Sequence, residues 1–284
     1  MVVSKTSVEP INFRFVQVEA PWPLGPADGR YVVRGHAGEP THVLVLSTLG
    51  AARRRRRRAR SAAPEPEPTA VPIGRATLID ARPLEVDPKE WLHNADLESE
   101  ALTGLSVINT VLQVQRVVAA DPNAHGIAAD QALVMRVGTG LGEQVAHGRW
   151  ESAMDVNLVA ARRKRQAILS PQERLASVLA GRDVAMACEE LALRARADVN
   201  CERWREAALQ LDCALRAALA ELTSWAGQGD IDARIEELDS GAAAIRDAAD
   251  TALIGGLSDV QIAATAATLG RLEAALRARA ALIR

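Results

Sequence analysis

Short runs of β-forming residues separated by polar turn segments characterise residues 11–50. Phe13, Phe15 and Val16 stand in the first run, and Pro26-Ala27-Asp28-Gly29 is one of the turn segments. Aromatic and β-branched residues between Gly, Pro and Asp clusters are typical of strands joined by turns. The pattern predicts a small, mostly antiparallel β domain in residues 1–86, with strands over residues 13–18, 30–34, 42–48 and 75–81.

Residues 51–74 interrupt this pattern. They contain six consecutive arginines, Arg53 to Arg58, and the alternating stretch Pro64-Glu65-Pro66-Glu67-Pro68. High charge and high proline content are typical of segments without a packed core. Because strand-like runs lie on both sides, we expect a disordered Arg/Pro-rich loop inserted in one sheet, not a domain boundary. The entropic cost of closing a loop grows slowly with its length, so such an insertion is tolerable.

From Asp87 onward the apolar spacing becomes helical. Asp87-Pro88-Lys89-Glu90 combines an N-cap, a proline at N1 and an acid at N3, which is a strong helix start. Leu97, Leu105, Ile108 and Leu112 then fit one long helix that ends by Asp121-Pro122. Similar starts recur at Ser170-Pro171, Asp183, Asp230 or Asp232, and Ser258. The predicted fold class is therefore α+β, with residues 87–284 forming a larger, all-helical domain of about seven to nine helices.

Residues 231–284 carry a heptad pattern. Ile231, Ile235, Leu238, Ala242 and Ile245 alternate spacings of four and three residues. Two seams of this kind suit an antiparallel, alanine-rich helical hairpin. The seams have two interpretations, packing inside the chain or a homodimer through the C-terminal helices.

Two short segments repeat one another. Gly148-Arg149-Trp150-Glu151-Ser152-Ala153 aligns with Glu202-Arg203-Trp204-Arg205-Glu206-Ala207. In each copy an aromatic residue, Trp150 or Trp204, precedes a small residue, Ala153 or Ala207, by three positions. Over residues 133–160 and 187–215 this pattern resembles the tetratricopeptide helical hairpin. The resemblance implies helix–turn–helix units with these four residues at the corners, and a role in binding segments of other proteins.

Charge changes the picture locally. The net charge of the chain is only −2, which excludes a strongly basic nucleic-acid coat protein. Residues 51–75, however, hold eight arginines against Glu65 and Glu67, a local charge of +6 that leaves −8 for the remainder. Such a segment can bind nucleic acid or another polyanion by releasing counterions. The candidate polyanion-binding residues are Arg53, Arg54, Arg55, Arg56, Arg57, Arg58 and Arg60.

Catalytic and cofactor motifs are weak. Gly138-Thr139-Gly140-Leu141-Gly142 has phosphate-loop spacing without a surrounding βαβ pattern, so we interpret these glycines as sites of close helix packing or of a helix kink. His93, Asp96 and Glu100 would share a face of the first long helix and form the one local His/acid group. The sequence predicts no cofactor, no metal and no catalytic residue, and it favours a non-enzymatic role without excluding an enzyme.

The compartment is suggested by cysteines and hydropathy. Cys188, Cys201 and Cys213 match no zinc spacing, and no secretory signal precedes them. We therefore expect free thiols in the cytoplasm and no membrane-spanning segment.

These patterns favour a protein–protein interaction or scaffold protein built on helical hairpins. The first alternative is nucleic-acid or polyanion binding through the Arg53–Arg58 loop. The second is an enzyme with a cleft between the β and α parts.

Overall fold

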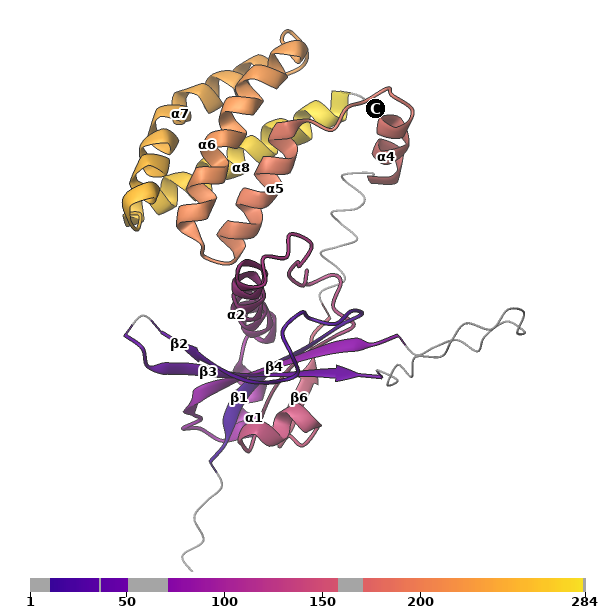
Figure 1. Cartoon of the computed structure of the whole chain (residues 1–284), viewed down its shortest axis with the longest axis vertical. Helices are drawn as coiled ribbons and strands as arrows, with labels where there is room; N and C mark the ends of the chain where they lie inside the picture. Colours follow the sequence, from indigo (N-terminus) through magenta and orange to yellow (C-terminus); the bar gives the residue numbers. More distant parts are fainter. Residues whose placement is uncertain (1–10, 36, 51–70, 158–170, 283–284) are drawn as a thin grey trace, which may run out of the picture. The chain divides into compact units, whose positions relative to one another are not determined.

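The computed structural model describes residues 11–35, 37–50, 71–157 and 171–282. The chain divides into two compact units, residues 1–162 and 163–284, which we call the sheet unit and the helical unit (Figure 1). An antiparallel sheet precedes a set of helices, so the predicted α+β class is confirmed. The predicted domain boundary at residues 86 and 87 is wrong, because the chain returns to the sheet between residues 134 and 155.

The sheet unit is built on six strands in the order β2-β3-β4-β1-β5-β6. Every neighbouring pair in this sheet is antiparallel. The first four strands lie where the β-forming runs predict them, and the last two were not predicted. The strands are β1 (Phe13–Ala20), β2 (Gly29–Arg34), β3 (Pro40–Leu49), β4 (Ile73–Pro83), β5 (Val134–Gly140) and β6 (Ser152–Asp155).

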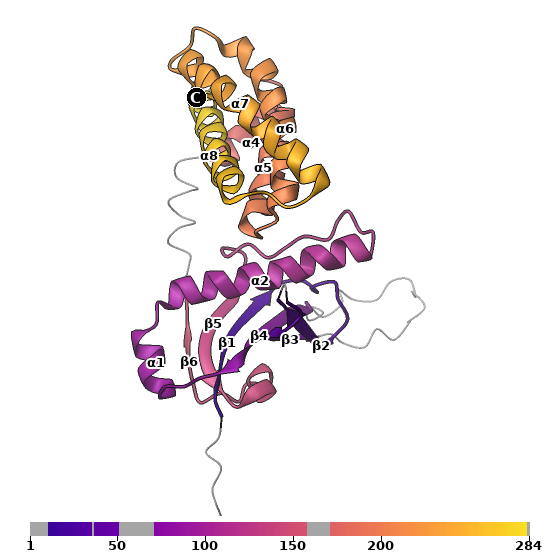
Figure 2. The same ribbon diagram turned by 90° about the vertical axis from the view of Figure 1, so that its left-hand side faces the viewer.

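Side chains of β1 point alternately to the two faces of the sheet, and each face has its own hydrophobic core. Val16, Val18 and Ala20 point to the face covered by helix α2 (Leu97–Val118), which Figure 2 shows lying along the sheet. Phe15 points to the opposite face, where it packs with Val145 of the 3-10 helix η1 (Gly142–His147). Because successive residues of a strand face opposite sides, a single strand serves both cores.

The long helix predicted from Asp87 is in fact two helices, α1 (Pro88–Asn94) and α2. Asp87 caps the first as predicted, accepting the N–H groups of Lys89 and Glu90 at 2.9 and 3.0 Å. Asp96 then caps the second by accepting the N–H of Ser99 at 3.1 Å. An aspartate side chain that binds a nearby N–H starts a new helix in preference to continuing the old one.

The hairpin that the repeat predicts spans residues 133–160, and the described residues 133–157 do not form a helical hairpin. They form β5, η1 and β6, so Trp150 precedes a strand and Ala153 lies on it. Two glycines of β5 allow the chain that follows this strand to pack closely against it. A Cβ on Gly138 would lie 2.4 Å from the carbonyl oxygen of Ser152, and one on Gly140 would lie 2.6 Å from Val145. Glycine at these positions therefore lets neighbouring segments pack closely against a strand, which corrects the interpretation of these residues as sites of close helix packing or of a helix kink.

The described part of the helical unit consists of helices joined by short turns. Helices α5 and α6 form a hairpin over the second repeat segment, with Trp204 at the start of α6 and Ala207 fully buried one turn later. The elements are α4 (Pro171–Leu179), α5 (Ala187–Asn200), α6 (Trp204–Glu221), η2 (Leu222–Trp225), α7 (Ile231–Ile254) and α8 (Asp259–Leu282).

Helices α7 and α8 occupy the heptad-patterned segment. Ile231, Leu238 and Ile245 are at most 1% exposed and lie at intervals of seven residues along α7. They pack within the helical unit, as the intrachain interpretation of the seam predicts. Ser258 begins α8 with a capping box, since its N–H donates to Gln261 Oε1 at 3.0 Å.

The contact between α2 and the sheet depends on a glycine. A Cβ on Gly104 would lie 2.6 to 2.9 Å from three side-chain atoms of Val16. We expect Gly104→Ala to lower the free energy of unfolding of the sheet unit by about 1–3 kcal/mol, as overpacking does. Urea unfolding followed by circular dichroism measures the change.

Gly270 in α8 is the matched control, because a Cβ there would meet nothing within 4 Å. Gly270→Ala is expected to stabilise the helical unit by up to about 1 kcal/mol, since alanine favours a helix over glycine. Equal stabilisation by both substitutions would show that α2 does not approach the sheet this closely.

Candidate functional site

The residues that the sequence proposes for polyanion binding, Arg53 to Arg58 and Arg60, lie outside the described residues. Polyanion binding through them therefore stays a prediction. The disordered loop predicted for residues 51–74 also falls mostly in this part of the chain, and strand β4 begins at Ile73.

The His/acid group of the sequence is not brought together. His93 is exposed in the last turn of α1, whereas Asp96 caps α2. Glu100 instead lies 3.8 Å from the guanidinium of Arg14. The break between the two helices removes the shared face that an acid–base or metal site there requires.

The two repeat corners have different surroundings. Trp150 packs against Phe15 with ring centroids 6.1 Å apart, and the guanidinium of Arg136 lies 4.6 Å from its ring centroid. Trp204 is half-buried at the beginning of α6. Trp150 thus supports the sheet unit, and only Trp204 stands at a helical corner.

A row of polar side chains crosses the face of the sheet under α2. His42, Asp80 and Arg14 are neighbours on β3, β4 and β1, and Arg14 forms an ion pair with Asp80. Burial lowers the pKa of His42, with the charge of Asp80 acting in the opposite direction. Because Arg14 is held between Asp80 and Glu100, we assign this row a structural role.

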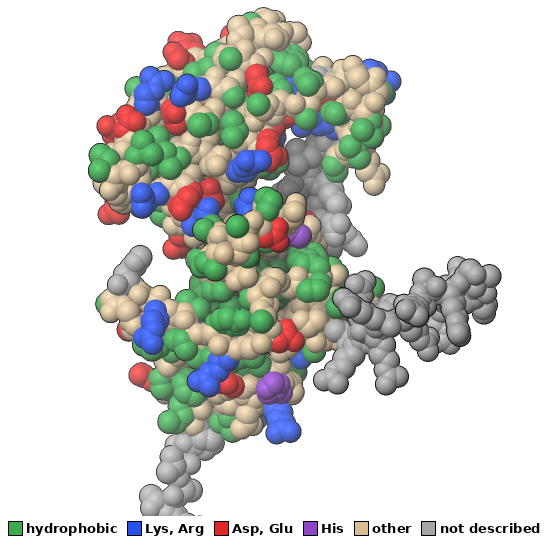
Figure 3. Space-filling model, viewed as in Figure 1, with side chains coloured by type: hydrophobic (Ala, Val, Ile, Leu, Met, Phe, Trp, Pro, Cys, Tyr) green, Lys and Arg blue, Asp and Glu red, His purple; other side chains and the backbone are tan. Residues whose placement is uncertain are grey.

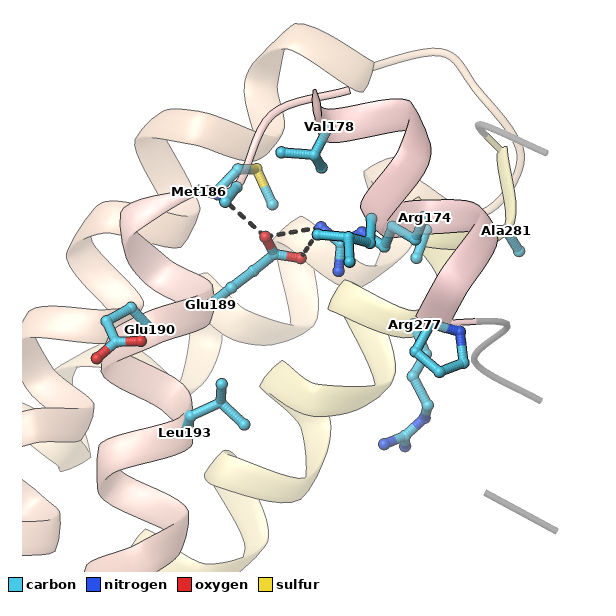
Figure 4. A pocket seen from close by; sticks show the side chains of 12 residues that line it. Arg174, Val178, Met186, Glu189, Glu190, Leu193, Arg277 and Ala281 are labelled. Carbon is cyan, nitrogen blue, oxygen red and sulfur yellow. Dashed lines mark hydrogen bonds and ion pairs between the residues drawn. The ribbon is translucent and has the colours of Figure 1, made fainter. Parts of the chain in front are cut away.

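The candidate site is a pocket of about 630 Å³ between α4, α5 and α8 (Figure 4). Eight of its twelve lining residues are apolar. Pockets that bind ligands or partner side chains are typically of this size, mostly apolar and bordered by a few polar groups. The lining residues are Pro171, Arg174, Leu175, Val178, Ala185, Met186, Glu189, Glu190, Leu193, Arg277, Ala280 and Ala281.

Apolar side chains of this pocket remain open to solvent. Leu175 of α4 is 57% exposed and Leu193 of α5 is 67% exposed. Helix α4 contains no buried residue, so the described part of the chain leaves its apolar side at least partly exposed. Figure 3 shows hydrophobic side chains at the surface over α4. Clustered exposed apolar side chains of this kind mark interaction sites more often than inert surface.

Ion pairs hold α4 at the pocket. The guanidinium of Arg174 donates to Glu189 at 2.6 and 2.8 Å and to Asp183 at 3.1 Å. Glu189 also accepts the N–H of Met186 at 3.0 Å and so caps α5, as the dashed lines of Figure 4 show. One carboxylate therefore both begins α5 and fixes α4 beside it.

Behind this wall lies a fully buried ion pair. The side chains of Arg279 and Asp183 are 0% and 1% exposed, with 2.5 Å between Nη2 and Oδ1. The guanidinium also lies 4.4 Å from the ring centroid of Trp225. Among the described residues, Nε and Nη1 of Arg279 have no hydrogen-bond partner, so the carboxylate of Asp183 provides most of the compensation for the buried positive charge.

The pKa of Asp183 reflects this environment. Burial opposes its ionisation, but the N–H of Val184 and the guanidinium groups of Arg174 and Arg279 outweigh burial and lower the pKa below its ordinary value. Asp183 is therefore ionised at neutral pH and stays so well into the acid range.

The lining of the pocket is apolar apart from four charged side chains, Arg174, Glu189, Glu190 and Arg277. It includes no histidine, cysteine or hydroxyl side chain. The nearby Cys188 is buried, and burial together with the carboxylate of Glu221 raises the pKa of its thiol, which keeps it protonated and unreactive. Within the described ranges no group of three or more His, Cys, Asp or Glu residues is placed to hold a metal ion.

Sequence reasoning found the start of α4 at Ser170-Pro171 but missed the pocket. The available signal was the spacing of Leu175, Val178 and Leu179, which gives α4 an apolar side without a heptad partner. The pairing of Asp183 with Arg279 had no local signal, because 96 residues separate them.

Removing the counter-charge tests the buried pair. We expect Asp183→Asn to lower the free energy of unfolding of the helical unit by about 3 kcal/mol, because it leaves the guanidinium of Arg279 buried without a carboxylate. Thermal or urea unfolding measures the loss. The control is Asp230→Asn, which breaks the exposed pair with Arg234 and is expected to change stability little. Similar losses of stability in both variants would contradict the prediction that the buried carboxylate of Asp183 contributes more to stability than the exposed carboxylate of Asp230.

The same pair predicts a pH dependence. Because the folded pKa of Asp183 is lowered, its contribution is fully present above its unfolded pKa of about 4 and is lost as pH falls through the folded pKa. The stability difference between the wild type and Asp183→Asn should therefore be constant from pH 7 to about pH 5 and shrink at lower pH. A difference that does not change down to pH 2 would contradict the lowered pKa.

No family model, curated protein or solved structure matches this chain. The tetratricopeptide resemblance therefore stays a prediction over residues 187–215, where α5 and α6 form a hairpin. No helix in the described ranges is long and apolar enough to cross a membrane.

Proposed function

We propose that this protein is a non-enzymatic protein–protein interaction or scaffold protein whose helical unit binds a partner in the pocket between α4, α5 and α8. One observation carries the proposal. Three helices border an apolar pocket of about 630 Å³ at the surface of the helical unit, and two leucines of its lining, Leu175 and Leu193, are more than half exposed.

The chemistry of the lining supports binding over catalysis. Two of its charged residues, Arg174 and Glu189, are engaged with one another, and no lining side chain is a nucleophile or an acid–base histidine. Leu175 and Leu193 expose more than half of their surface to water. Covering such side chains with apolar groups of a partner is favourable, by about 25 cal/mol for each Å² removed from water.

The helical hairpin of α5 and α6 supports the same role. The pattern around Trp204 and Ala207 resembles hairpins that bind protein segments, and α5 contributes Glu189, Glu190 and Leu193 to the pocket. A homodimer is the variant of this proposal in which the partner is a second copy of the chain.

The second candidate function is binding of nucleic acid or another polyanion by Arg53 to Arg58 and Arg60. The run of six consecutive arginines in the sequence favours it. Affinity of this kind falls steeply with salt, because it comes from counterion release.

A pull-down with matched variants tests the proposal. The full chain, tagged, captures partners from nuclease-treated extract of its own host. Leu193→Asp places a charge in the pocket, whereas Leu253→Asp places it on α7 at a side chain that is equally exposed, at 68% against 67%. Because a charge inside an apolar contact must be desolvated, we expect the first variant to lose a stoichiometric protein partner at least tenfold.

The control variant should retain the partner. Partners retained by both variants would overturn the pocket as the binding site. Partners captured from a parallel untreated extract but absent from the nuclease-treated one would instead favour the arginine run.

A further inference from the structure

The three helices around the pocket each contribute one face. Helix α4 lines it with Pro171, Arg174, Leu175 and Val178, at positions i, i+3, i+4 and i+7. Residues 186, 189, 190 and 193 repeat this spacing at α5, and residues 277, 280 and 281 follow the same spacing on α8. Residues three and four apart lie on one side of a helix, so three helix faces border one space.

A space bordered by helix faces suits another helix. Ridges of side chains at these spacings pack into the grooves of a neighbouring helix. Amphipathic helices bind hydrophobic grooves through anchors at the same i, i+3, i+4 and i+7 positions. The wall formed by α4 is nine residues long and contains no buried residue, and Leu193 of the α5 wall is 67% exposed.

Charges at the rim distinguish between possible helices. Arg174 is paired with Glu189, and Glu190 is paired with Arg194 at 2.9 Å. Arg277 lines the pocket, is exposed and has no ion-pair partner among the described residues. The uncompensated charge of the lining is therefore one positive charge, carried by α8.

We infer that the pocket takes an acidic amphipathic helix of a partner protein, with apolar side chains between α4, α5 and α8 and a carboxylate beside Arg277. This inference rests on the proposed function and adds the chemical class of the partner. A basic helix would bring its charge against Arg277, and like charges at an interface select against the wrong partner.

Two model peptides test the inference. Both are 18-residue helices with leucine at positions i, i+3, i+4 and i+7. The other positions are shared between alanine and a charged residue, which is glutamate in the acidic peptide and lysine at the same positions in the basic peptide. Fluorescence anisotropy measures binding of each labelled peptide to the full chain at low and at physiological salt.

The expected result is at least about fivefold tighter binding of the acidic peptide, the scale of an exposed ion pair gained against a repulsion. Arg277→Glu should reverse this preference. Arg271→Glu, on the same helix but outside the pocket lining, adds the same charge and should leave the preference for the acidic peptide. Leu193→Asp should weaken both peptides at least tenfold, whereas Leu253→Asp should weaken neither.

The outcomes distinguish failure of the acidic-helix inference from failure of the proposed function. Equal binding of both peptides, lost in Leu193→Asp, would overturn the acidic class and leave the proposed function standing. Binding that Leu193→Asp does not alter would overturn the proposed function with it. Failure of both peptides to bind, with concentration-dependent self-association that Leu193→Asp abolishes, would replace the acidic helix by a second copy of the chain. Failure without such association would also overturn the helical partner.

Discussion

Arg279 carries its charge into the interior of the helical unit, where Asp183 compensates it and the ring of Trp225 lies against it. Water cannot solvate this guanidinium, so the segment that bears Asp183 must stay on α8 for the charge to be tolerated. That segment is the connection between α4 and α5. The buried ion pair therefore fixes, relative to α8, the connection at which α4 ends and α5 begins. This placement determines where the pocket between the three helices lies.

The walls of the pocket differ in how they are held. Helices α5 and α8 share a core that includes Cys188, Ala192 and Leu272, so they are held by packing. Helix α4 buries no residue and is held by Arg174, which contacts Asp183 and Glu189. Elements with few buried contacts open at lower free energy than core elements. The pocket thus has two walls held by core packing and one wall held mainly by ion pairs.

Features that depend on neighbouring residues could be predicted from the sequence, whereas features that depend on pairing between distant segments could not. A helix cap such as Asp87 binds N–H groups within three residues of itself, and the strand that contains Phe15 is recognisable from its β-forming residues. By contrast, β5 is a strand because it pairs with β1, about 120 residues earlier, so Val134–Gly140 was mistaken for part of a helix. The pocket was missed for the same reason, since the connection that follows α4 is joined to α8 by pairs of residues far apart in sequence, such as Asp183 with Arg279.

The energetics of the pocket set the kind of association that it supports. Full burial of a leucine is worth about 1.5–3 kcal/mol, so covering Leu175 and Leu193, each already partly buried, adds only a few kcal/mol. Association costs at least about 4 kcal/mol in lost translational and rotational freedom. The gain from this chain roughly offsets that cost, so in the proposed complex net affinity must come from the apolar anchors of the partner and from its carboxylate at Arg277. On this proposal, binding selects partners by their pattern of side chains, because neither the leucines nor the arginine suffices alone.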